Sequence, residues 1–98
     1  MPNITITAQQ AVQAAFSYVG EMYSGQAQDI LLEEIELRET EVVWAVTVSF
    51  VRVSPLAPVG STGLITQSLG ARAPRLYKAL EIDAETGAVR AMRIRSHD

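Results

Sequence analysis

A strictly alternating run between residues 42 and 53 limits what this chain can fold into more than any other feature. One face of the run carries Val42, Trp44, Val46, Val48 and Phe50, and the other carries Val43, Ala45, Thr47, Ser49 and Val51. Because successive side chains of a strand point to opposite faces, and β-branched and aromatic residues favour strands, the run predicts a β-strand. At about 3.3 Å per residue it would be roughly 40 Å long. We expect it in the middle of a sheet.

The N-terminal part of the chain predicts a single helix. Thr7 and Gln10 have the spacing of a capping box. Apolar residues then recur three and four positions apart, at Val12, Ala15, Phe16, Val19, Met22 and Tyr23. The helix is expected from Ala8 to about Ser24, with Gly25 ending it. Gly20 lies inside it, and a close packing contact would explain a glycine there.

Three further strands are expected, at residues 30–39, 75–83 and 88–95. In the first, the apolar phase slips by one residue after Leu32, which predicts a bulge near Glu33 and Glu34. In the last, the phase slips after Ala91. The predicted fold is α+β, with one N-terminal helix packed on a curved four-stranded antiparallel meander in the order α-β-β-β-β. Expected core residues are Phe16, Val19, Trp44, Val46, Val48, Leu80 and Ile82.

The stretch between the last two strands combines an acid, a hydroxyl and a glycine. Asp83 has the right position to accept hydrogen bonds from backbone N–H groups two or three residues on, and Gly87 can take a positive φ. A calcium loop needs several more oxygen ligands at alternate positions, and only Asp83 and Glu85 have suitable spacing. We therefore interpret Asp83, Thr86 and Gly87 as a structural turn and expect no metal site.

Length and composition indicate one domain spanning residues 1–98, with no cysteine and a net charge of −3. We expect no cofactor, no catalytic site, no nucleic-acid partner and no membrane partner. The N-terminus shows no signal-peptide pattern, so a cytoplasmic location is expected, and export stays open if a signal was removed. His97, next to the last residue, is interpreted as part of a disordered tail. The glutamates between positions 33 and 41 are interpreted as a solvated edge protected against aggregation. A candidate basic strip comprises Arg90, Arg93 and Arg95, with Lys78 and Arg75, but it has no interleaved aromatic residues and no basic excess that would indicate nucleic-acid binding.

Residues 54–74 form a long connection that is unusual in a compact domain. They contain three of the four prolines and three of the six glycines, together with apolar residues at Leu56, Val59, Leu64, Ile65 and Leu69. Long connections of this kind are usually functional or disordered. The strand face that carries Val43, Ala45 and Val51 is also free of charge, and one helix covers only one face of a sheet. We therefore predict that these eight residues contribute to a partner-binding surface, although the loop could instead fold over its own sheet.

Two stretches resemble a known family. The helix start, with Ile6, Thr7 and Ala11, and the final hairpin, with Ile82, Asp83, Ala84, Thr86, Gly87 and Val89, are similar to those of PepSY-like domains. The resemblance implies a curved antiparallel sheet on one helix, and a non-catalytic module that regulates or inhibits partner proteins, including peptidases. We accordingly predict a protein-binding module, inhibitor-, immunity- or antitoxin-like. The alternatives are a small-molecule-binding domain and a self-associating assembly subunit, including a homodimer.

Overall fold

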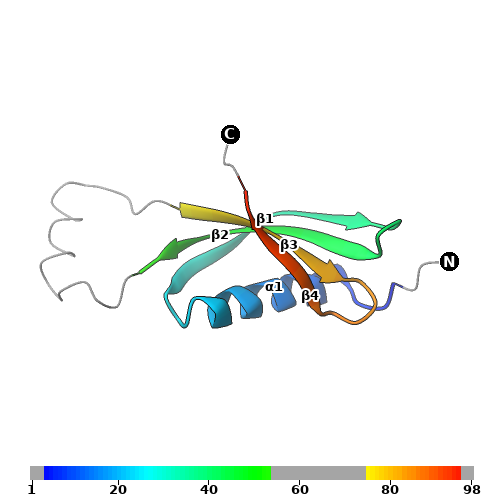
Figure 1. Ribbon diagram of the computed structural model, residues 1–98, viewed down its shortest axis with the longest axis horizontal. Coiled ribbons are helices and arrows are strands. Elements are labelled where there is room, and N and C mark those ends of the chain that lie inside the picture. The colour runs from blue at the N-terminus through cyan, green and yellow to red at the C-terminus, as the bar shows by residue number, and fades with distance from the viewer. Residues whose placement is uncertain (1–3, 54–74, 96–98) are drawn as a thin grey trace, which may run out of the picture.

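The computed structural model describes residues 4–53 and 75–95. A single helix, α1 (Ala8–Met22), is followed by four strands, β1 (Ala27–Arg38), β2 (Val43–Arg52), β3 (Arg75–Asp83) and β4 (Val89–Ile94). The strands pair antiparallel in sequence order, so β2 and β3 lie inside the sheet and β1 and β4 form its edges. Figure 1 shows α1 lying against one face of this sheet. The predicted α-β-β-β-β architecture is confirmed.

The capping box at the start of α1 forms as predicted. The Thr7 hydroxyl accepts a hydrogen bond from the Gln10 backbone N–H at 3.1 Å, and the Gln10 side chain accepts one from the Thr7 N–H at 2.8 Å. The helix ends at Met22, two residues earlier than expected, because Ser24 and Gly25 both adopt positive φ. The explanation offered for Gly20 is wrong, since a Cβ added there would meet nothing within 4 Å.

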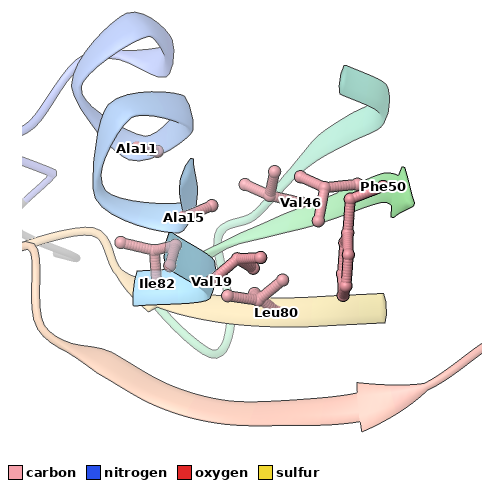
Figure 2. Close-up of a cluster of buried hydrophobic side chains, with 8 residues drawn as sticks. Ala11, Ala15, Val19, Val46, Phe50, Leu80 and Ile82 are labelled. Atoms are coloured by element: carbon pink, nitrogen blue, oxygen red, sulfur yellow. The ribbon is translucent and has the colours of Figure 1, made fainter. Parts of the chain in front are cut away.

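The buried stripe of α1 is narrower than the sequence pattern suggested. Ala11, Ala15 and Val19 are fully buried, whereas Met22 is 53% exposed. Residues four apart lie above one another on a helix, so these three form a straight line of small side chains. Figure 2 shows this line directed at Val46, Phe50, Leu80 and Ile82 of the inner strands. Small residues let the helix approach β2 and β3 closely, which leaves Val12 at the side of the contact.

Bulges keep apolar side chains on the helix side of the sheet. The pairing of β1 with β2 shifts between Leu32 and Glu34, which confirms the bulge predicted there, and shifts again between Gln28 and Leu31. After the shift between Leu32 and Glu34, Ile35 lies opposite Val46 on the same face as α1. In β4 the irregularity falls at Arg90, one residue earlier than expected.

Trp44 is half-buried and has a polar role that the sequence did not predict. Its ring packs against the core, and its Nε1–H donates to the backbone carbonyl of Ile6 at 3.2 Å. The backbone N–H groups of Thr5 and Ile6 in turn donate to the Ala84 carbonyl at 2.8 and 3.0 Å. Trp44 therefore holds the segment before α1 against the β3–β4 turn. Within the described residues, no helix has the length and apolar character needed to cross a membrane.

We predict that Phe50, rather than Trp44, is the aromatic residue on which stability depends most. Phe50 is completely buried, with its ring centroid 4.9 Å from that of Tyr23. Phe50→Ala should lower the free energy of unfolding by about 3–5 kcal/mol, because it removes a large side chain from a packed core. Phe16→Ala, which truncates a half-buried ring on the same core, should cost clearly less. Urea denaturation followed by circular dichroism measures both, and equal losses would show that the core is wrongly placed.

Candidate interaction surface

The face of the sheet turned away from α1, which we call the far face, is polar over its centre. Thr47 and Ser49 of β2 are buried there, at 6% and 0% exposure, although no helix or strand of residues 4–53 and 75–95 covers them. Side chains from the neighbouring strands lie over them instead. The charge-free pattern of β2 therefore does not make the whole face free of charge, because charged residues of β1, β3 and the end of β4 lie on the same face.

One group of side chains joins β1, β2 and β3 at Ser49. The Ser49 hydroxyl donates to Glu33 Oε2 at 2.6 Å and accepts from Arg75 Nε at 3.0 Å. Arg75 also donates through Nη1 to Asp29 Oδ2 at 2.8 Å and through Nη2 to the Asp29 carbonyl at 2.5 Å. The β1 bulge places Glu33 within reach of the serine. The hydrogen bonds satisfy a hydroxyl that would otherwise be costly to bury.

A second group joins β4 to β1 across the far face. Arg95 Nη1 donates to Glu34 Oε1 at 2.5 Å and to the Thr47 hydroxyl at 2.6 Å. Arg93 of β4 pairs with Glu81 of β3 at 2.9 Å. These contacts bring acidic side chains from β1 and β3 against basic side chains from β4. The far face therefore has an acidic side at β1 and a basic side at β4.

The residues predicted to bind a partner fall into three groups in the structure. Val43 is 1% exposed, so its side chain offers no surface, and it pairs with Asp83 where Arg90 bridges the Asp83 carboxylate and the Glu41 carbonyl. Ala45 and Val51 are half-buried on the far face, and a partner contact there stays a prediction. The remaining five lie outside the described residues, as does His97: Leu56, Val59, Leu64, Ile65 and Leu69.

An open groove lies on the other face of the sheet, between the first half of α1 and β1. It has a volume of about 400 Å³ and is lined by Ala8, Gln9, Val12, Gln13, Leu32 and Ile35. Leu32 is 44% exposed, which is unusual for a leucine on the same face as the core. The groove exists because α1 sits over the inner strands and leaves this part of β1 uncovered.

Among the strands of residues 4–53 and 75–95, none pairs with the outer side of β1 beside the groove, so its backbone there is open to an additional strand. The Ala84 N–H donates to the Val42 carbonyl at 2.9 Å, which fixes the hydrogen-bonding phase between β2 and β3. Because the phase alternates along antiparallel strands, Val43, Ala45 and Thr47 direct their backbone groups toward β1. Their partners Arg38, Glu36 and Glu34 point back at β2. By the same alternation, the N–H and C=O groups of Ile35 and Leu37 point outward, away from the sheet.

The open edge is acidic. Residues 27–42 contain six acidic residues and one basic residue: Asp29, Glu33, Glu34, Glu36, Glu39, Glu41 and Arg38. More than half of the acidic residues of the chain thus lie on β1 and the turn after it. Glu36 is exposed and contacts Arg38 at 3.3 Å, a surface ion pair of little strength. An extended segment added here would meet carboxylates on its far-face side and the groove on the other.

The turn between β3 and β4 has the structure predicted for it. Asp83 Oδ1 accepts hydrogen bonds from the backbone N–H groups of Glu85 and Thr86, both at 2.9 Å, and the Thr86 hydroxyl accepts one from Ala88. Gly87 adopts φ 83°. The Thr86 and Glu85 N–H groups and the Arg90 guanidinium lower the pKa of Asp83 to about 2. No group of three or more possible metal ligands occurs within the described residues.

Sequence reasoning missed the groove. The predicted bulge near Glu33 and Glu34 does keep Leu32 and Ile35 on the same face as α1, but the sequence pattern did not place Val12 beside them. The sequence did contain a signal for the groove. The apolar stripe of the helix is wider than the line of small side chains that contacts the sheet, so part of the stripe is left over. No family model, curated protein or solved structure matches this chain.

The two glycines at contrasting positions should respond to alanine in opposite directions. Gly87→Ala should lower the free energy of unfolding by about 1 kcal/mol, since alanine is disfavoured at positive φ. Gly20→Ala should raise it by about 0.5–1 kcal/mol, because alanine is the better helix former and the position is open. Chemical denaturation of both variants checks the pair, and destabilisation by Gly20→Ala would mean that the helix packs differently.

The lowered pKa of Asp83 predicts a stability difference that disappears in acid. The carboxylate is stabilised only when ionised, so its contribution is complete above its unfolded-state pKa of about 3.9 and is lost as the pH falls toward 2. Asp83→Asn should therefore be less stable than the unmodified protein at pH 6, and the gap should close between about pH 4 and pH 2. Glu85→Gln, which neutralises a neighbouring carboxylate of the same turn, is the matched control. Thermal melts across this range measure both.

Proposed function

We propose that this protein is a non-catalytic contact module of the cytoplasm that binds an extended segment of a partner protein along β1. The observation that carries the proposal is the groove between α1 and β1 beside outward-pointing backbone groups. A segment laid against β1 gains main-chain hydrogen bonds from Ile35 and Leu37, which is the general mode of strand addition to a sheet edge. Its alternate side chains enter the groove.

The regular half of β1 is the part suited to this pairing. Between Glu34 and Arg38 the strand pairs with β2 without a register shift, whereas both bulges lie before it. Bulges discourage pairing at a strand edge. The incoming segment would therefore lie opposite residues 34–38, with Leu32 and Ile35 under its apolar side chains.

Charge defines the chemistry of the partner segment. Glu34 and Glu36 project from the far face of the same half-strand, and opposite charges on facing residues stabilise neighbouring strands. The segment that fits is one in which apolar residues alternate with lysine or arginine. The PepSY-like resemblance agrees with such a role, and an inhibitor-, immunity- or antitoxin-like regulator is the class of protein that works through a contact of this kind.

A second candidate function is the binding of a small apolar molecule in the same groove. Its volume of about 400 Å³ lies within the range of ligand pockets. A metabolite that raises the melting temperature of the unmodified protein, and does so no longer in Leu32→Arg, would favour this reading over a protein partner.

We predict that Leu32→Arg abolishes partner binding without unfolding the protein. Leu32 is 44% exposed, so the substitution removes little buried surface, yet it places a charged side chain in the groove that the apolar side chains of the segment must enter. Glu85→Arg adds a cation at the tip of the β3–β4 turn and serves as the matched control. Both variants and the unmodified protein are immobilised at low density and exposed to extract of the native host.

A protein that is retained by the unmodified chain and by Glu85→Arg, but not by Leu32→Arg, is then purified. Its binding to the purified chain is measured by calorimetry. Equal retention of that protein by Leu32→Arg would refute the groove as its site, and the absence of any specifically retained protein would refute the proposed function.

A further inference from the structure

The two edges of the sheet carry complementary patterns. On β1, Ile35 and Leu37 lie on the helix side and Glu34 and Glu36 on the far face. On β4, Met92 and Ile94 lie on the helix side and Arg93 on the far face, together with Arg95, the first residue after the strand. Ile94 is 84% exposed. The strand β4 is thus itself an extended segment in which apolar and basic residues alternate.

No other described strand pairs with the outer side of β4, and its outward-pointing backbone groups alternate in the phase that matches β1. The Arg95 N–H donates to the Tyr77 carbonyl at 2.9 Å, and the Asp83 N–H donates to the Ala88 carbonyl at 2.7 Å. By alternation along the β3–β4 pair, Arg93 and Arg95 direct their backbone groups at β3. The N–H and C=O groups of Met92 and Ile94 therefore point outward, as those of Ile35 and Leu37 do on β1.

We propose that β4 of one copy of this chain adds to β1 of the next, as the partner segment in the surface described above, so this inference rests on the proposed function. The register that joins the outward-pointing residues sets Ile35 opposite Ile94 and Leu37 opposite Met92. In the same register Glu36 faces Arg93 and Glu34 faces Arg95. Apolar pairs then fall on the helix side and ion pairs on the far face.

The direction of the strands allows this contact without turning either copy over. Strands β1 and β4 run antiparallel within one molecule, because each of the four strands reverses its predecessor. A second copy in the same orientation therefore presents its β4 antiparallel to the first copy's β1, with both helices on the same side of a continuous sheet. Such head-to-tail contacts leave a free edge at each end, so association continues beyond a dimer unless a ring closes.

Each edge also disfavours pairing with itself. The bulge-free half of β1 is centred on Glu36, so pairing it with its own copy over its full length places glutamate against glutamate. Pairing β4 with itself about Ile94 places Arg93 against Arg95. Like charges on directly facing residues destabilise neighbouring strands. The charges thus select β1 with β4, and the Arg95–Glu34 contact within one chain shows that these two side chains can form an ion pair.

The contact is small, with about four residue pairs, and specific stable interfaces bury roughly 1,200–2,000 Å². Association is therefore expected to be weak and to depend on concentration. Sedimentation equilibrium of the unmodified protein from about 10 µM to about 1 mM should show a mass that rises past that of a dimer, or reaches that of a closed ring. A monomer at every concentration would overturn the inference.

Charge exchange tests the register. Glu36→Arg alone and Arg93→Glu alone should each reduce the association constant at least tenfold, because each sets like charges on facing positions. The double variant, with both substitutions in one chain, should restore association. Failure of the double variant to recover, with each protein shown to be folded by circular dichroism, would overturn the Glu36–Arg93 pairing.

The backbone phase has its own test. Leu37→Pro removes an N–H that points outward, so the protein should fold and fail to associate, whereas Glu36→Pro removes an N–H bonded to β2 and should unfold β1. Undiminished association of Leu37→Pro would overturn strand addition at β1. The capture experiment with Leu32→Arg is run at low density, where copies do not meet, so a foreign partner found there preserves the proposed function even if self-association fails.

Discussion

The close contact between the small side chains of α1 (Ala11, Ala15 and Val19) and the inner strands determines the rest of this structure. Ala11 and Ala15 lack the bulk to hold the helix away from the sheet, so α1 sits deep against Val46 and Leu80. A helix that lies deep over β2 and β3 covers a narrow band. What it leaves uncovered, chiefly Leu32 on β1 and Ile94 on β4, becomes the apolar surface of the two edges.

The far face shows how a sheet with one covering helix can protect its other side. Thr47 and Ser49 lie on a face that no described helix covers, and long charged side chains reach over them from β1, β3 and the end of β4. Arginine is suited to this task, because its guanidinium makes several hydrogen bonds at once while its methylene stem lies along the sheet. The cost of burying two hydroxyls is offset locally, and no second layer of structure is required.

The sequence predicted local structure well, because each local signal has a short-range physical cause. The Thr7–Gln10 cap, the bulge at Glu33 and the Asp83–Gly87 turn all depend on residues within a few positions of one another. The sequence failed where distant segments meet. It could not show that Arg75 and Arg95 lie over β2, because nothing in β2 itself records its neighbours. It also overestimated the burial of Val12 and Met22, because an apolar stripe does not determine how closely the helix packs against the sheet.

Edge strands normally carry features that prevent pairing, and β1 and β4 combine such features with selectivity. Charge is the usual protection of an edge, because an added strand of like charge is repelled. Here the protecting charge is negative on β1 and positive on β4, so the residues that repel a second copy of the same edge would, in the proposed contact, attract the opposite edge. The bulges confine this attraction to a few residues. A contact of that size would stay reversible, as the proposed binding of other extended segments to β1 requires.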